Sequence, residues 1–255
     1  KNLELNPVQI PATDSTTTLQ SIQKSFRYAA TELDYFFAAT LDKWHDLNVP
    51  DTLKRRFQLS ILPKIGTNHV LSSKVENDWS INLLAGQSAG VRYFEAAGLG
   101  NFTKNEVRGV QLAGLFNYNR GVCKGLQAAG LYNRTADTLE GIQLAGLMNV
   151  AESRPKHDFQ AAGLINILRT DSTQNTKQEP PGCIQLAGLV NKAGSLNGIQ
   201  ASGLINRCQS INGLQIGVIN TASEVQGFQS GVVNHAKRMK GLQIGLINTA
   251  EEITG

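Results

Sequence analysis

One short phrase recurs through the last two thirds of the chain and constrains the fold more than any other feature. Its plainest copy, Gly241–Asn248, reads Gly-Leu-Gln-Ile-Gly-Leu-Ile-Asn, and most upstream copies carry one extra residue, usually Ala. Including a worn copy at Phe94–Asn101, there are ten copies. They are spaced by sixteen residues early and fourteen late, with one step of 25 between Gln160 and Gln185. Repetition at this period predicts stacked structural units, none of which can bury its apolar face alone.

Each copy has the alternation of a β-strand. In the last copy, Leu242 and Ile244 fall on one side of the chain and Gln243 falls on the other. This period-two pattern is typical of a strand, and the two glycines of each copy would each destabilise a helix by about 1 kcal/mol. The segment between copies, as in Thr221–Gln226, has one apolar position and predicts a short return strand. We therefore expect the Leu and Ile sides of stacked copies to form the continuous core.

An Asn closes every copy, at the point where the chain must turn, and Asn tolerates left-handed backbone better than most residues. Parallel coils stacked about 4.8 Å apart would align these amides in a ladder, and the Gln residues could form a second ladder. An antiparallel meander would send alternate Asn residues to opposite ends. The sequence therefore predicts an all-β parallel β-solenoid (β-helix) of about ten coils of 14–16 residues, narrower where the extra Ala is lost. The predicted ladder consists of Asn101, Asn117, Asn133, Asn149, Asn166, Asn191, Asn206, Asn220, Asn234 and Asn248.

Residues 1–78 lack the repeat and predict a capping region. An extended start is followed by apolar residues at spacings of three and four from Leu19 to Trp44, which predict an amphipathic helix. Two strand-like stretches follow, at 55–63 and 78–86, with a loop between them. Because no linker precedes the repeats, we expect 1–78 to cap a solenoid repeat domain that spans 79–255.

Charge and cysteine content exclude several classes of partner. The net charge of +4 is scattered, and no Lys/Arg-rich run predicts a nucleic acid or an anionic membrane as a partner. No apolar run approaches the length of about 18 residues that a membrane-spanning helix needs.

The cysteines Cys123, Cys183 and Cys208 occupy different positions of their repeats. We therefore expect small buried residues, without disulfides and without a zinc site.

Alignment of the repeats produces one column of charged and titratable residues: Arg108, Lys124, Glu140 and His157. In an in-register sheet its neighbours would lie about 5 Å apart. A Lys–Glu–His cluster could act as acid and base, but charges of mixed sign along a ladder are more typical of weak surface ion pairs. No nucleophile elbow, phosphate loop or zinc helix is present. The sequence predicts no catalytic residue, no metal site and no cofactor.

An insert after Asn166 accounts for the long step. It adds about nine residues to one coil, and insertions in solenoids protrude from one face and often carry binding. Its composition is also that of a flexible polar loop that tolerates drift. The residues that form a candidate binding site in this insert are Thr170, Asp171, Gln174, Asn175 and Lys177.

Three segments in a fixed order resemble a known family. The order begins with Phe57–Asn68 (Phe-Gln-Leu-Ser-Ile-Leu-Pro-Lys-Ile-Gly-Thr-Asn) and continues with Trp79–Gly90 (Trp-Ser-Ile-Asn-Leu-Leu-Ala-Gly-Gln-Ser-Ala-Gly). It ends in the Gly-x-Gln-x-Ala-Gly-Leu-x-Asn copies. In this order, over roughly residues 56–255, the chain resembles bacterial surface-repeat proteins, exported proteins of Gram-negative bacteria without an assigned activity. The resemblance implies export and association with the cell surface, the periplasm or the outer membrane, and it supplies no catalytic residues. The long step and the helical N-terminus depart from it.

From the repeats, the lack of a catalytic constellation and this resemblance, we expect a non-enzymatic scaffold or an adhesion or binding module. Its expected partner is a surface glycan or a protein. The alternative is a carbohydrate-binding or polysaccharide-cleaving β-helix, which stacked Gln and polar columns would permit. We expect the abrupt start at Lys1 to be a processed or trimmed end.

The C-terminal coil generates a first prediction. Gly255 stands where another copy would begin, and an uncovered last strand would expose unpaired backbone groups beside Leu242 and Ile244. We expect a weak homodimer through this coil, or a covering by an earlier segment of the chain. Analytical ultracentrifugation over a wide concentration range tests this expectation. A strict monomer with rapid amide exchange throughout 241–255 would contradict both versions.

The amphipathic helix predicted near residues 18–46 generates a second prediction. It should dock on the solenoid, because Phe36, Phe37 and Trp44 are unfavourable in water. Phe36→Asp should therefore lower the melting temperature by several degrees. An unchanged melting curve, with the helix still visible by circular dichroism, would show that the helix stands free.

Overall fold

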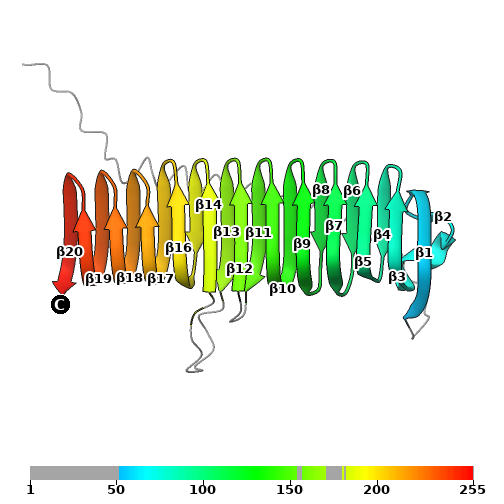
Figure 1. Ribbon diagram of the computed structural model, residues 1–255, viewed down its shortest axis with the longest axis horizontal. Helices are drawn as coiled ribbons and strands as arrows, with labels where there is room; N and C mark the ends of the chain where they lie inside the picture. Colours follow the sequence, from blue (N-terminus) through cyan, green and yellow to red (C-terminus); the bar gives the residue numbers. More distant parts are fainter. Residues whose placement is uncertain (1–51, 154–156, 171–179, 181, 255) are drawn as a thin grey trace, which may run out of the picture. The chain divides into compact units, whose positions relative to one another are not determined.

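The computed structural model describes residues 52–153, 157–170, 180 and 182–254, and it shows parallel β-coils stacked along one axis (Figure 1). The predicted all-β parallel solenoid is confirmed. The predicted N-terminal helix lies outside the described residues. Within the described ranges the helical segment is the short 3-10 turn η1 (His69–Lys74). No helix in these ranges is long and apolar enough to cross a membrane.

Each coil has two walls, named here for the side chains that they bury. The Gln wall contains β1 (Leu53–Leu62), β3 (Val75–Asn82), β5 (Gly90–Ala97), β7 (Val107–Ala113), β9 (Cys123–Ala129), β12 (His157–Ala162), β14 (Gly182–Ala187) and β16 (Ser195–Ser202). The Asn wall contains β4 (Ala85–Ser88), β6 (Gly100–Thr103), β8 (Phe116–Asn119), β11 (Met148–Ser153), β13 (Ile165–Thr170), β15 (Val190–Ala193) and β20 (Ile247–Ile253). Four long strands bend from the Asn wall into the Gln wall: β10 (Tyr132–Ala145), β17 (Ile205–Ile216), β18 (Ile219–Ser230) and β19 (Val233–Ile244).

Coil-to-coil pairing is parallel along both walls, and chemically equivalent residues face each other. Gln143 pairs with Gln127 on one side and with Gln160 on the other. The long step does not break this register, because Gln185 still pairs with Gln160. The pairing of the Gln wall is therefore the same on both sides of the long step.

Parallel pairing already begins at β1, whose Phe57 faces Trp79 of β3. The two strand-like stretches expected to cap the solenoid are therefore the first strands of the Gln wall itself. Between them lie β2 (Ile65–Gly66), which pairs antiparallel with β1, and the turn η1. The segment expected to be a loop thus covers the outer edge of β1 with a short antiparallel strand, a common protection for an open sheet edge.

The predicted Asn ladder is confirmed. Each Asn from Asn101 to Asn234 donates Nδ2–H to the Oδ1 of the next Asn, with nitrogen–oxygen distances of 2.8–3.0 Å. The same nitrogen also donates to a backbone carbonyl of the following coil, as Asn133 does to Leu144 at 2.6 Å. These Asn side chains are fully buried. Their hydrogen bonds to the neighbouring coils supply the partners that a buried amide needs.

The Gln residues form a second ladder that runs in the opposite direction. Each Gln from Gln127 to Gln243 donates Nε2–H to the Oε1 of the preceding Gln, at 2.7–2.9 Å. The Asn amides thus donate toward the C-terminal end of the stack and the Gln amides toward its N-terminal end. Each coil is tied to both neighbours through its interior as well as through its backbone.

The prediction that the Leu and Ile side of each copy forms the core is wrong. The Gln side chains point inward, and those from Gln111 to Gln229 are fully buried. Leu242 and Ile244 lie outside, with 54% and 53% of their surface exposed. The glycine-containing turn between the Gln and the Asn shifts the alternation, so that both amides face the interior. There they satisfy one another, which removes the penalty for burying them.

The apolar part of the interior lies where the return segment closes the coil. Its members are almost fully buried: Val107, Cys123, Leu139, Leu196, Ile211, Val225 and Met239. The Asn-wall column beside it is polar in early coils and apolar in late ones. Thr135 in this column accepts a hydrogen bond from Gln143 at 3.0 Å and donates one to Gln127 at 2.9 Å. These bonds tie the two walls together.

The three cysteines are free and buried, as predicted. They lie in three different columns, because Cys123 faces Leu139, Cys183 faces Gly198 and Cys208 faces Ala222. Burial raises the pKa of the Cys123 and Cys208 thiols to about 12. Both therefore remain protonated at neutral pH and act as small apolar side chains.

The glycine that opens most copies is required by the stacking. Gly125 has φ 134°, and a Cβ at this position would lie 2.0 Å from the carbonyl oxygen of Gly109 in the preceding coil. Asp158 and Cys183 occupy this column on the two sides of the insert, without a positive φ, and both side chains are buried. The backbone therefore departs from the repeat geometry at these two positions.

The Asn ladder begins with a substitute. Gly86 occupies the ladder position of its coil, since it pairs with Asn101, and the side chain of Asn82 fills the space that a side chain at Gly86 would need. Asn82 donates Nδ2–H to Asn101 Oδ1 at 3.1 Å and accepts a hydrogen bond from Gln58 at 3.2 Å. Gln58 of β1 in turn accepts a hydrogen bond from Asn68, the residue before η1, at 2.7 Å. Buried polar side chains therefore replace the missing Asn at the N-terminal end of the ladder.

The ladder generates a stability prediction. Asn133→Ala should destabilise the fold by about 1–3 kcal/mol, because it leaves buried partners unsatisfied on both neighbouring coils. Asn248→Ala should destabilise it less, because Asn248 is exposed and donates only to Gly245 of its own coil. Urea unfolding of both variants gives the comparison. Equal losses of unfolding free energy at the two positions would contradict a ladder that acts through stacking.

Candidate functional site

The insert that sequence analysis selected as a binding site is only partly described. Thr170 is the last residue of β13 and pairs with Ser153 of β11. Asp171, Gln174, Asn175 and Lys177 lie outside the described residues. Their role in binding stays a prediction.

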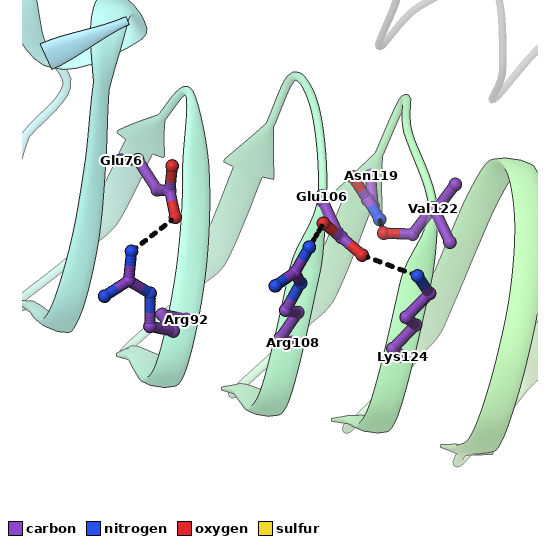
Figure 2. A network of polar contacts seen from close by, with 7 residues as sticks. All are labelled: Glu76, Arg92, Glu106, Arg108, Asn119, Val122 and Lys124. Carbon is purple, nitrogen blue, oxygen red and sulfur yellow. Dashed lines mark hydrogen bonds and ion pairs between the residues drawn. The ribbon is translucent and has the colours of Figure 1, made fainter. Parts of the chain in front are cut away.

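The charged column is brought into register as the repeats predict. Lys124 pairs with Arg108 on one side and with Glu140 on the other, along the outer surface of the Gln wall. The partner that joins the first two members was missed by sequence reasoning. Glu106, in the corner before β7, accepts from Arg108 at 2.5 Å and from Lys124 at 3.0 Å (Figure 2).

A second ion-pair group lies next to it along the stack. Arg92 approaches Glu76 at 3.4 Å and Asp78 at 3.3 Å (Figure 2 shows the pair with Glu76). The hydrogen bond from Arg108 holds the pKa of the Glu106 carboxyl below its ordinary value, and Lys124 adds to this effect. These residues form a strip of charges that is called the ridge below: Glu76, Asp78, Arg92, Glu106, Arg108 and Lys124. The positive and negative charges of the ridge therefore neutralise one another.

The ridge has the chemistry of a stabilised surface and not of a reaction centre. The Arg108 and Lys124 side chains are 60% and 43% exposed, so their ion pairs are screened by water. Among the described residues no group of His, Cys, Asp and Glu is arranged to hold a metal ion. Nearby, Asn119 accepts a hydrogen bond from Gly121 and donates to the Val122 carbonyl at 3.1 Å, which fixes the adjacent turn (Figure 2).

The carboxyl group of Glu95 lies inside the solenoid, at the end of the Gln ladder toward which the amides donate. Glu95 occupies the Gln column next to Gln111 and is fully buried. Its Oε2 accepts from Gln111 at 2.8 Å and from Thr103 at 3.2 Å, and its Oε1 accepts from Ser88 at 3.4 Å. Because water and substrate cannot reach it, Glu95 is a structural acid and not a general acid or base.

Exposed apolar side chains also line the outer surface of the Gln wall in successive coils. Residues that precede the inward Gln form a column on the outside of the Gln wall, here called the first outer column. It is apolar in every coil: Phe57, Trp79, Phe94, Val110, Leu126, Ile142, Phe159, Ile184, Ile199, Leu214, Phe228 and Leu242. Ile142, with 42% exposure, is representative of its outward position.

A second column follows the inward Gln and alternates in size from coil to coil; it is here called the alternating column. After Leu59, which pairs with another large residue, the alternating members are Ile81, Ala96, Leu112, Ala128, Leu144, Ala161, Leu186, Ala201, Ile216, Ser230 and Ile244. Beyond it, leucines and valines stack at the corner of the coil, from Leu99 to Leu246. An open groove of ≈ 880 Å³ runs along the alternating column from Leu112 to Ile216 and along the small residues that follow it, such as Ala145 and Ala162.

This face can form an extensive apolar contact. Its three columns contain no charged side chain in the part of the chain that the structure describes. It is about 50 Å long and about 15 Å wide at sheet spacings, which gives roughly 750 Å². The largest apolar patch of an ordinary monomer is about 300–600 Å², and larger ones mark interaction surfaces. Sequence reasoning missed this site because it placed these side chains in the core.

Glu95 generates a prediction about pH. Burial raises the pKa of its carboxyl above the ordinary value of 4.5, and hydrogen bonds from Gln111 and Thr103 oppose this shift only in part. A carboxyl whose folded pKa exceeds the unfolded one contributes stability at pH below the unfolded value, and this contribution is lost as pH rises through the folded pKa.

Glu95→Gln should therefore raise the melting temperature at pH 8 by a few degrees, since 1 kcal/mol corresponds to about 2–4 °C in a chain of this size. It should also remove the loss of stability between pH 4.5 and neutrality. Melting curves from pH 4 to pH 8 test this, with the exposed Glu251→Gln as the matched control. A Glu95→Gln variant that is less stable than the parent at pH 8 would contradict the prediction.

Searches of protein-family models, curated proteins and solved structures find no match to this chain. The likeness of its motifs to bacterial surface-repeat proteins therefore stays a sequence-based expectation.

Proposed function

We propose that this chain is a non-enzymatic, exported surface-repeat scaffold, which acts as an adhesion or binding module through the outer face of its Gln wall. The observation that carries the proposal is the uninterrupted apolar surface formed by the first outer column, the alternating column and the corner residues. Export and surface location are supported by the resemblance of the motifs to bacterial surface-repeat proteins.

The placement of the polar groups supports a scaffold and not an enzyme. The Gln and Asn side chains that recur in every coil are consumed by the two internal ladders. Glu95 is buried, and the thiols of Cys123 and Cys208 stay protonated because burial raises each pKa to about 12. The exposed side chains of Arg108 and Lys124 are paired with Glu106. The hydroxyl groups of Ser88 and Thr103 hydrogen-bond to Glu95, but all three side chains are buried.

The interior supports a rigid module. From the coil of Gln111 onward, each coil is bonded to the next through backbone pairs, an Asn amide and a Gln amide, so bending the stack would break several hydrogen bonds at once. A rigid array presents its outer columns at fixed spacing, and this reduces the conformational entropy that is lost on binding.

The glycan-directed alternative loses the feature that suggested it. Stacked Gln amides were the expected sugar-binding groups, but the structure turns them inward. The outward positions beside them are mostly aliphatic, as Ile142, Ile184 and Leu186 show, and these cannot replace the hydrogen bonds of a hydrated sugar. The carbohydrate-cleaving β-helix stays an alternative prediction, which a turnover assay addresses.

A double variant tests the proposed contact surface. Ile142→Lys combined with Ile184→Lys should reduce the retention of the purified chain on isolated cell envelopes of its source organism at least tenfold. The melting temperature should stay within about 2 °C, because both side chains point away from the core. The control is Arg108→Gln with Lys124→Gln, which removes neighbouring exposed charges and should leave retention unchanged.

Two results would contradict the proposal. One is the release of unsaturated sugar from polyuronates, or any other turnover of polysaccharide, by the parent chain. The other is equal retention of the parent and the Ile142→Lys/Ile184→Lys variant. Protease accessibility on intact cells tests the surface location independently of either result.

A further inference from the structure

We propose that the partner of this apolar face is the same face of a second copy, packed with the two solenoid axes antiparallel. The inference rests on the proposed function, because it names the partner of the same surface. It is carried by the alternating column, whose large side chains (Leu112, Leu144, Leu186) are separated by small ones (Ala128, Ala161) in successive coils.

The period of this pattern selects the partner. One large and one small residue span two coils, which is about 9.6 Å along the axis at a strand spacing of about 4.8 Å. A helix repeats every 5.4 Å and an extended strand about every 6.8 Å, so neither stays in step with the pattern over many coils. A second solenoid has the same period and matches along the whole face.

Two-fold symmetry then fixes the arrangement. For two faces to meet, the symmetry axis must lie in the plane between them. If it runs along the solenoid axis, each coil meets the equivalent coil with the strand direction reversed, so that an axis over the alternating column brings Leu144 onto Leu144 and Ala161 onto Ala161. If it runs along the strands, the two stacks are antiparallel and the order of coils is reversed. An axis placed between two adjacent coils then brings every large residue opposite a small one.

The register can be followed residue by residue. With the axis between the coils of Ala161 and Leu186, Ala161 faces Leu186 of the second copy and Leu144 faces Ala201. Further out, Ala128 faces Ile216. With the axis one coil earlier, between Leu144 and Ala161, these two residues face each other. Both registers fill the ≈ 880 Å³ groove of each copy with the large side chains of the other.

The charged ridge is compatible with antiparallel stacks. In the first register Arg108 comes opposite Gln226, and Lys124 opposite Asn212, because these two later members of the column, which precede Lys240, are neutral. No like charges meet at these two positions.

The area is sufficient for a stable dimer. A face of roughly 750 Å² on each copy buries about 1,500 Å² in total, within the range of about 1,200–2,000 Å² for specific interfaces. Two β-sheet faces with interdigitating side chains pack about 10 Å apart, as in a β-sandwich. The proposed contact is isologous, so it closes at two copies and does not propagate.

The test replaces the small residue Ala161 by a large one and then shortens the large residue that would face it in the second copy. The full chain should sediment as a dimer, and Ala161→Leu should raise the dimer dissociation constant at least tenfold, because the added side chain meets a large residue of the second copy. The double variant Ala161→Leu/Leu186→Ala, or Ala161→Leu/Leu144→Ala, should recover most of the affinity, and the one that does so identifies the register. Ala161→Leu should remain folded, because the first outer column already carries large residues on consecutive coils, Ile142, Phe159 and Ile184.

Thr221→Leu is the matched control, since it adds a similar apolar group to the outer side of the Asn wall and should not change the dissociation constant. A monomer at all concentrations overturns the inference. So does an association that Ala161→Leu leaves unchanged or strengthens, as non-specific apolar contact predicts. Flotation of a monomeric chain with phosphatidylcholine vesicles, increased by Ala161→Leu, would assign the face to a lipid surface and also overturn it.

These outcomes separate the inference from the proposed function. A monomer that still needs Ile142 and Ile184 for retention on envelopes keeps the contact surface and rejects the second copy. A dimer whose retention is unaffected by lysine at these positions keeps the pairing and rejects the function of this face in adhesion.

Discussion

The hydrogen bond between identical amides on successive coils is the interaction on which the structure depends. A primary amide is strongly disfavoured in a protein interior unless its donor and acceptor are both used. Here a repeat of about 4.8 Å places each amide within hydrogen-bond distance of its copies on both sides. The same condition requires strict register, and the register explains the glycine at Gly125, where the preceding coil approaches too closely for a side chain.

Much of this fold could be predicted from the sequence, because the spacing of the repeats shows which residues pair between neighbouring coils. Equivalent residues recur at fixed spacing, so parallel stacking and the Asn ladder follow from the pattern alone. The inside and the outside could not be assigned in the same way. Alternation shows that two sets of side chains face opposite directions, and the usual preference for buried Leu over buried Gln pointed to the wrong set. That preference assumes an amide without partners, whereas Gln143 finds one in Gln127 and another in Gln160.

The insert and the charged column were selected as candidate sites because the Leu side chains had been assigned to the core. Once Leu144 and Leu186 are assigned to the core, no apolar surface is left to consider, and attention moves to the insert and the charged column. The size alternation from Leu112 to Ala201 is nevertheless visible in the printed repeats. Glu106 was missed for a different reason: it lies in the corner between coils, where the copies differ most. Glu95 was recognisable as a departure from the Gln column, but its burial depended on which face is interior. The extent of the apolar surface is consistent with the proposed binding module. The ridge of paired charges beside it keeps one edge of this surface hydrated.

The opposite directions of the two ladders have an electrostatic consequence. In an α-helix all peptide dipoles point the same way, and charge accumulates at the ends as the helix lengthens. In this stack the dipoles of the Asn amides point one way along the axis and those of the Gln amides point the other, in nearly equal number. Their fields cancel coil by coil, and the parallel backbone ladders contribute little net dipole of their own. A rod built in this way can gain or lose coils without changing the potential at its ends, so its length is free to vary.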